Sequence, residues 1–329
     1  MVAEQKKLPP PPRLIATLAA GFETTASHVT VILPPVLLDL FLWLGPHLRL
    51  KQLLSALILQ LFSLASQASI TPSDAAQAQD VWASFLEQFN LLSILRTFPV
   101  GVSSLMGGRM PIETPFSAAI QYEVSSVADI LGWGLLLVVL GWIFGGTYFH
   151  WVSGVALNLD SMSRPLFRSI VQTILLSVIW LVLAFILGVP ALMVFGALVF
   201  ISPLVAQAAL LLLAFFSLWV IIPVYFSPHG IFIYQQNVFA AILNSLRMAR
   251  FTLPSSGLFL LSAILLSQGL DFLWRTPPED SWWTVVGIGG HAFVSTALLA
   301  ASFIYYRDVN VWLQAVFEQL KAQMTSARA

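Results

Sequence analysis

One carboxylate is conspicuous in this sequence because its neighbours are hydrophobic. Asp39 lies in the stretch "PPVLLDLFLWLGP", residues 34–46, which otherwise suits the hydrocarbon of a membrane. A charged side chain well inside a membrane span costs roughly 2.5–3.5 kcal/mol, and such residues usually face protein or a water-filled cavity. Asp39 is therefore a candidate contact for a proton, an ion or a substrate. The alternative is structural, because Trp43 lies only one turn further out: Asp39 would then lie near the interface, hydrogen-bonded to a loop.

A histidine is the second candidate for chemistry inside the membrane. His291 lies in "GIGGHAFVSTALLAAS", and intramembrane histidines can relay protons. With Asp39 it forms a candidate polar pathway. The alternative is a satisfied core histidine that bonds to a neighbour such as Ser295, since buried polar groups normally find partners. Asp271 precedes Arg275 by four residues, a spacing that predicts an ion pair in the interface.

No motif in the sequence predicts catalysis. The chain has no cysteine, which excludes disulfides, thiol catalysis and cysteine metal sites. It contains no H-E-x-x-H, no paired histidine and carboxylate spacing, no glycine-rich phosphate loop and no G-x-S-x-G. The formal net charge is zero, so no electrostatic argument favours nucleic acid as a partner. We therefore expect no catalytic residue, no metal, no cofactor and no enzymatic activity.

The elements that must position these residues are membrane-spanning helices. Of the 329 residues 58% are hydrophobic and only 9% charged, against roughly 25% charged in soluble domains. A span needs about 20 mainly apolar residues. The sequence predicts an all-α, polytopic helical membrane bundle of about six transmembrane helices, at Val29–Leu44, Ile130–Val152, Ile170–Gly188, Leu204–Phe226, Gly257–Trp274 and Trp283–Tyr306.

The distribution of Lys and Arg predicts the direction of these spans. With the N-terminus inside, ten of the 15 basic residues fall in inner segments and five in outer ones. We therefore expect a multi-pass protein of the cell membrane with both termini in the cytoplasm. The proline-bracketed stretch at 188–203 is expected to be a short apolar element that dips in from the outer face.

Several segments are predicted to lie on the membrane rather than across it. After a cytoplasmic tail at 1–13, the single membrane domain runs over 14–306 and contains an outer helical insert at 45–126. That insert is predicted to be a helical hairpin that caps the outer face. Its second helix, within 79–99, has an apolar face formed by Val81, Phe85, Phe89 and Leu92.

Amphipathic patterns outside the insert predict interfacial helices. They occur at 14–28, at 231–251, where Phe239, Ile242 and Leu246 share a face, and in the cytoplasmic C-terminal segment 307–329. Small residues predict where spans pack closely, within a bundle or across a dimer. These helix-packing residues are Gly134, Gly141, Gly145, Ala292, Thr296 and Ala300.

The stretches "FAAILNSLRMARFTLPSSGLFLLSAILL" and "FVSTALLAASFIYYRD" resemble the closing helices of a known group. It consists of bacterial six-span integral membrane proteins of unknown function, similar to the membrane domain found beside glycerophosphodiester phosphodiesterases. The likeness lies mainly in residues 229–307 and rests on Ser245, Arg247, Tyr305, Tyr306 and Arg307. The phosphodiesterase domain is absent, so the resemblance implies no hydrolase activity.

These observations favour a non-catalytic protein that organises the membrane or serves as an accessory subunit. Its expected partners are the lipid bilayer and either partner membrane subunits or a second copy of the chain. A transporter or permease component, with Asp39 in a polar pathway, is the alternative. A weak internal repeat supports that alternative: residues 28–46 and 251–278 each end in an aspartate, a Phe/Leu/Trp run and a proline.

Overall fold

The computed structural model describes residues 10–65, 72–116, 119–159 and 165–326. Helix makes up 81% of the structure, which confirms the predicted all-α polytopic class. In the described ranges five helices are long and apolar enough to cross a membrane. They are α6 (Val127–Leu157), α7 (Leu166–Ile201), α8 (Pro203–Tyr234), α9 (Val238–Trp274) and α10 (Thr284–Ser326).

The first predicted span, Val29–Leu44, is a short helical segment that a break separates from the helix before it. Helix α1 (Leu14–Ser27) ends at His28, whose φ of −131° and ψ of 59° are not helical. A 3₁₀ turn (Val29–Ile32) and α2 (Leu33–Leu44) follow. Helix α2 is too short to cross alone, so the number of spans is five, or six if α1 and α2 together count as one.

The chain divides into two compact units, each built from several segments. One unit holds residues 30–148 and 267–295, and the other holds residues 1–29, 149–266 and 296–329. Helices α6, α9 and α10 therefore each contribute to both units. Each unit is described by itself below.

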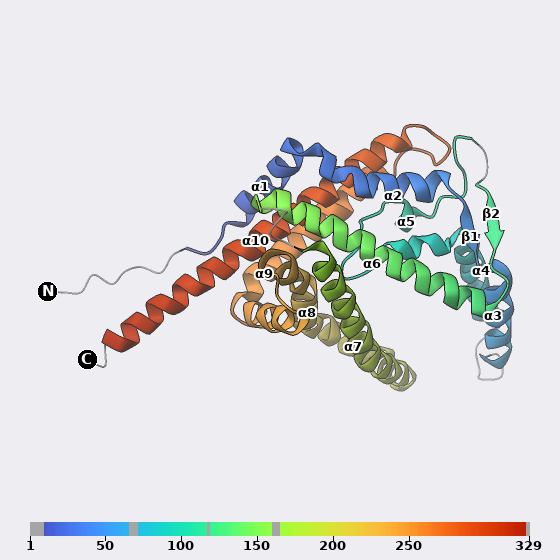
Figure 1. Ribbon diagram of the computed structural model, residues 1–329. Coiled ribbons are helices and arrows are strands. Elements are labelled where there is room, and N and C mark those ends of the chain that lie inside the picture. Colours follow the sequence, from blue (N-terminus) through green and yellow to red (C-terminus); the bar gives the residue numbers. More distant parts are fainter. Residues whose placement is uncertain (1–9, 66–71, 117–118, 160–164, 327–329) are drawn as a thin grey trace. The chain divides into compact units, whose positions relative to one another are not determined.

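The unit built around residues 30–148 contains the predicted outer insert. Helices α3 (Lys51–Ala65) and α4 (Pro72–Gln88) pack against each other, as the predicted hairpin requires (Figure 1). Strands β1 (His47–Arg49) and β2 (Gln121–Glu123) pair in parallel, with His47 opposite Gln121. A 3₁₀ turn (Leu91–Leu95) and the short helix α5 (Met106–Arg109) complete the insert.

The second helix of the hairpin ends earlier than its apolar pattern predicts. Helix α4 stops at Gln88, and Asn90 has extended angles, φ −120° and ψ 118°. The Asn90 Oδ1 atom accepts hydrogen bonds from the backbone N–H groups of Leu92 and Leu48, both at 3.1 Å. These bonds compete with helix continuation, so Leu92 is buried in the unit core instead of extending the face of Val81 and Phe85.

Helices α7 and α8 form an apolar pair in the other unit (Figure 1). The expectation of a separate dipping element at 188–203 is wrong, because α7 continues through Pro190 to Ile201. Proline removes one backbone donor, so it costs the helix one hydrogen bond. The residues around Pro190 are almost all apolar, and a non-helical backbone in hydrocarbon would leave more polar groups unpaired than the helix does.

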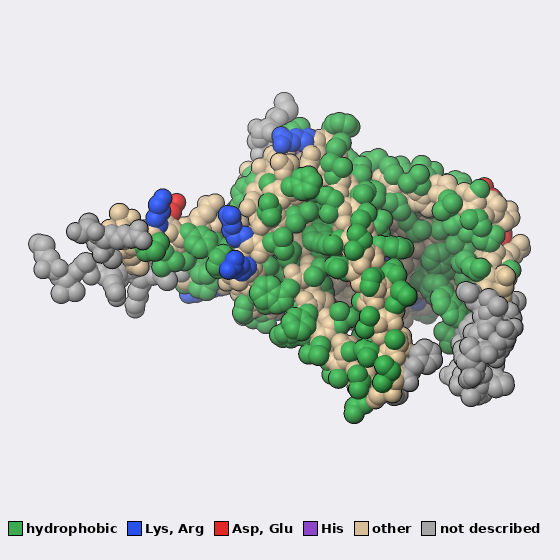
Figure 2. Space-filling model, turned by 90° about the horizontal axis from the view of Figure 1, so that it is seen from below, with side chains coloured by type: hydrophobic (Ala, Val, Ile, Leu, Met, Phe, Trp, Pro, Cys, Tyr) green, Lys and Arg blue, Asp and Glu red, His purple; other side chains and the backbone are tan. Residues whose placement is uncertain are grey.

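These two helices expose their hydrophobic side chains to an unusual degree. Only 6% of the most apolar window of α7 and 11% of that of α8 is buried. Figure 2 shows hydrophobic side chains over much of the visible surface of the long helices, with few charged ones among them. Such a surface is incompatible with water on this scale and suits hydrocarbon.

A kink divides α9 into an amphipathic part and an apolar part. Thr252 has non-helical angles, φ −128° and ψ 20°, two residues before Pro254. Its hydroxyl donates to the carbonyl of Met248 at 2.7 Å, a side-chain bond that supports the backbone next to the kink. Residues 238–251 thus form the predicted amphipathic segment, with Phe239 and Leu246 exposed. Residues 231–234, which were assigned to that segment, belong instead to the end of α8.

Helix α10 is continuous from Thr284 to Ser326. Its 43 residues correspond to about 65 Å at a rise of 1.5 Å per residue, which is about twice the hydrocarbon thickness. The predicted C-terminal amphipathic segment is therefore the end of the same helix as the last predicted span.

Candidate functional site

Asp39 is fully buried and accepts three hydrogen bonds from the protein. One carboxylate oxygen accepts from the Ser104 hydroxyl at 2.5 Å and from the Met106 N–H at 2.9 Å. The other accepts from the Leu105 N–H at 3.0 Å. Charge-assisted bonds of this kind offset the cost of removing a carboxylate from water.

The segment that receives Asp39 is held by its own local bonds. Ser104 donates to Asp39 and accepts from the N–H of Gly107 at 2.8 Å, so its hydroxyl fixes the start of the short helix α5. Leu105 and Met106 are themselves almost completely buried in the unit core together with Trp43. The carboxylate therefore ties helix α2 to the insert, and the arrangement is the structural alternative considered for Asp39.

A second buried pair lies in the same unit. Nδ1 of His291 and Oδ1 of Asp271 are 2.6 Å apart, and both residues are buried. The expectation that Asp271 would pair with Arg275, and His291 with a neighbour such as Ser295, is wrong. The reason is helix packing: Gly287 and Gly290 have no side chain where Trp274 lies, so α10 approaches the end of α9 closely.

Asp39 and the Asp271–His291 pair lie in the same compact unit. A carboxylate–imidazole pair is the chemistry of a general base or a proton relay. Among the described residues, however, no three His, Asp or Glu side chains converge as metal ligands. The four surface cavities described in this chain are all lined by other side chains.

An ion pair and several hydrogen bonds, here called the polar seam, hold the end of α5 and the residues after it against the segment around Glu279. The Arg109 Nε atom lies 3.3 Å from a carboxylate oxygen of Glu279, and the Arg109 Nη2 atom donates to the carbonyl of Pro277 at 2.7 Å. Glu279 also accepts from the N–H of Ile112, and its carbonyl accepts from the indole N–H of Trp43. Sequence reasoning missed this seam, because its partners are up to 236 residues apart.

Strand β1 carries a buried cationic network. Nδ1 of His47 lies 3.1 Å from Nη2 of Arg49, and its Nε2 lies 3.2 Å from the carbonyl oxygen of Leu42. A neutral ring that donates from Nε2 satisfies both contacts. Burial, and then the Arg49 charge, lower the pKa of His47 below its ordinary value of 6.5. Burial also lowers the pKa of Arg49.

The predicted packing residues have different surroundings. A Cβ at Gly145 would lie 2.6 Å from Cα of Gly101, and one at Gly141 would lie 2.5 Å from the Thr97 side chain. These two glycines of α6 therefore pack against a loop rather than against another helix, whereas Gly134 has open space beside it. The small residues of α10 are fully buried: Ala292, Thr296 and Ala300. Gly21 of α1, which the pattern did not single out, packs against Ala297 and Ala301.

Comparisons with known proteins add nothing to this geometry. No protein-family model, no curated protein and no solved structure matches the chain.

Proposed function

We propose that this chain is a non-catalytic integral membrane protein that organises lipid or partner membrane subunits. The observation that carries this proposal is the state of Asp39, whose two oxygens accept three hydrogen bonds from the protein. A carboxylate whose two oxygens both accept bonds from another segment ties the two segments together. Its cost in hydrocarbon is offset by the fold, so no further function is needed to explain it.

The apolar pair α7–α8 also supports this role. Its exposed leucines and methionines extend over two long helices, and the most exposed include Leu192, Met193, Leu204 and Leu211, each above 70%. A surface of that kind contacts lipid tails, helices of a partner subunit or a second copy of the chain. We place the protein in the cell membrane of a bacterium with both termini cytoplasmic, in accordance with the Lys and Arg distribution and the resemblance described above.

One observation favours a second candidate, a transporter or permease component. Asp39, Asp271 and His291 are three titratable side chains buried in one region of a membrane protein. Intramembrane groups of this kind often form proton relays. In that case Asp39 would exchange a proton during transport, and its hydrogen bonds would open and close.

The substitution Asp39→Asn distinguishes the two roles. The amide cannot accept from all three donors, and its NH₂ group faces a backbone N–H. We therefore expect a loss of about 3 kcal/mol of stability, seen as a melting temperature lowered by several degrees in detergent. Asp129→Asn is the matched control, because Asp129 is exposed and bonds only within its own turn. It should change stability by less than about 0.5 kcal/mol.

Both variants and the wild type are also reconstituted in vesicles that contain a pH-sensitive dye. The proposed role predicts no proton flux that depends on Asp39 when a membrane potential is imposed. A wild type that conducts protons, together with an Asp39→Asn variant that melts normally but conducts none, would establish the transporter and refute the proposal.

A further inference from the structure

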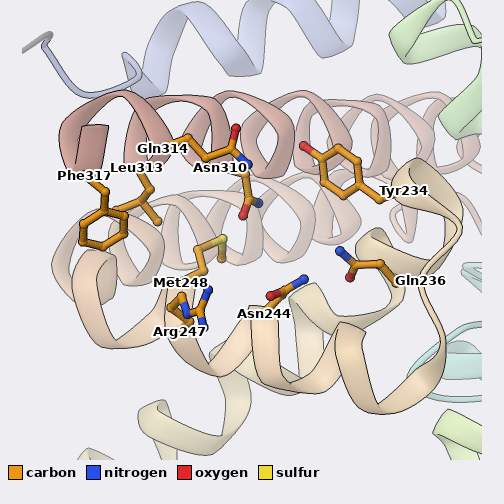
Figure 3. Close-up of a pocket in the computed structure, with 9 residues that line it drawn as sticks. All are labelled: Tyr234, Gln236, Asn244, Arg247, Met248, Asn310, Leu313, Gln314 and Phe317. Carbon is orange, nitrogen blue, oxygen red and sulfur yellow. The ribbon is translucent and has the colours of Figure 1, made fainter. Parts of the chain in front are cut away.

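A polar cavity lies within the unit that contains α7 and α8. It has a volume of about 300 Å³ and is lined from the end of α8, the first half of α9 and the C-terminal part of α10. In Figure 3 Asn310 points from α10 toward Met248 of α9, and the ring of Tyr234 points into the same space. A volume of this size is near the lower end for small-ligand sites, so it suits a headgroup-sized ligand.

The charges around the cavity favour an anion. Arg247 is the one charged residue among the side chains that line it, and no carboxylate lines it. Asp308, two residues before Asn310 on α10, is paired with Arg307 at 2.8 Å. Arginine binds phosphate oxygens through its planar fork of donors, and side-chain amides such as that of Asn244 add neutral donors beside it.

Gln236 gives the cavity a side-chain amide that can serve a ligand hydroxyl. Its Oε1 atom is buried and has no hydrogen-bond partner among the described residues. The atom lies beside Gly230, where a methyl group would collide with it, so the close fit depends on glycine. A buried acceptor left unpaired costs about 1–3 kcal/mol, and a turn of the amide toward a ligand hydroxyl in the cavity would remove that cost.

The mouth of the cavity is apolar. Phe317 lines it and forms an edge-to-face pair with Phe251, with ring centroids 5.2 Å apart. Phe251 is 50% exposed and the nearby Leu320 is 41% exposed. A free phosphate would gain nothing from these side chains, whereas acyl chains would cover them.

From this combination we infer that the cavity binds the headgroup of an anionic phospholipid that carries a hydroxyl, such as phosphatidylglycerol. The phosphate contacts Arg247, the hydroxyl donates to Gln236, and the acyl chains lie over Phe251 and Phe317. This inference rests on the proposed function, because it names the lipid that a membrane-organising protein would bind.

The test is native mass spectrometry of the full-length protein in neutral detergent. Dioctanoyl phosphatidylglycerol is titrated onto the wild type and onto Arg247→Gln. We expect the variant to bind about tenfold more weakly, because one charge-assisted contact is lost. Arg168→Gln is the matched control, since Arg168 is exposed on α7 of the same unit and does not line the cavity. It should stay within about twofold of the wild type.

A second variant tests the hydroxyl contact. Gln236→Leu should remove the preference for dioctanoyl phosphatidylglycerol over dioctanoyl phosphatidic acid, which has no headgroup hydroxyl. Dioctanoyl phosphatidylcholine should bind weakly to all forms, and glycerol 3-phosphate should not compete at the lipid's concentration.

Three results would overturn the site. They are equal losses in both arginine variants, equal binding of phosphatidylcholine, and competition by glycerol 3-phosphate at the lipid's concentration, which would indicate a site for a soluble phosphate. Failure of lipid binding would leave the proposed function standing, because that proposal is decided by stability and proton flux at Asp39.

Discussion

At the scale of single residues, the buried aspartates Asp39 and Asp271 bond to partners distant in sequence. Asp39 bonds to Ser104, 65 residues away, and Asp271 to His291, 20 residues away. In hydrocarbon or in a packed interior an unpaired polar group is costly, so each such contact specifies one arrangement of the segments that carry it. The polar residues of this chain are few, and their main effect is therefore on which segments meet.

His47 provides a pH-dependent example outside the spans. Its folded pKa is lowered by burial and by Arg49, so the ring stays neutral in the folded protein below pH 6.5 while the unfolded chain takes up a proton. Stability from this group is therefore complete above pH 6.5 and decreases as the pH falls toward the lowered pKa of His47. We expect the melting temperature of the wild type to fall on acidification more than that of His47→Gln.

The measurement is thermal unfolding of both proteins in detergent between pH 8 and about pH 5. The difference between the two profiles of melting temperature against pH gives the contribution of His47. Parallel curves would show that the His47 ring titrates normally in the folded state and that its contact with Arg49 does not hold it neutral.

At the scale of elements, close approach depends on where glycines meet backbone. Gly145 of α6 faces the loop around Gly101, and a Cβ there would lie within 3 Å of Cα and N of Gly101 and of the carbonyl oxygen of Val100. Backbone cannot give way as a flexible side chain can. We expect Gly145→Ala to destabilise the protein by roughly 1–3 kcal/mol because the loop must shift.

Gly134 provides the control on the same helix. Nothing lies within 4 Å of a Cβ at that position. Gly134→Ala should be neutral or stabilising by up to about 1 kcal/mol, since alanine is the better helix former. Equal melting temperatures for the two variants would mean that the loop does not pack on α6 as described.

Some of these helices could be predicted from the sequence and some helix ends could not, for a physical reason. Long apolar runs predicted the helices from α6 to α10, because hydrophobicity is a property of the local sequence. The end of α4 was not predictable, since it is set by a bond from Asn90 to Leu48, 42 residues away. Pro190 was interpreted as a break, but apolar surroundings on both sides keep α7 helical.

The candidate site divides in the same way. The hydrophobic neighbours of Asp39 and His291 in the sequence show that these two residues are unusual. The sequence does not show their partners, because Ser104 is one of several polar residues in a loop rich in glycine and proline, and no pattern distinguishes it. The pairing of Asp271 with His291 needed the close approach that Gly287 and Gly290 allow, which is a property of two helices together.

At the scale of the whole molecule, the open question is whether α1 and α2 cross the membrane. Between α4 and the C-terminal end of α10 lie five long apolar helices, an odd number of crossings. If all five cross, positions 83 and 322 lie on opposite sides. Position 11, before α1, lies opposite position 83 only if α1 and α2 together form a sixth crossing.

Because the chain has no cysteine, single-cysteine labelling answers this directly. Pro11, Ala83 and Ala322 are all exposed, so each is replaced by cysteine in turn and intact cells are treated with a membrane-impermeant maleimide. With six spans and cytoplasmic termini, we expect Ala83→Cys to react at once and the other two only after permeabilisation.

Reaction at positions 11 and 83 together, but not at 322, would mean five crossings, with the α1–α2 pair on the outer side. Reaction at 83 and 322 together would mean that one of the five long helices does not cross, and the outward-facing apolar surface of α7 and α8 makes that pair the first to re-examine.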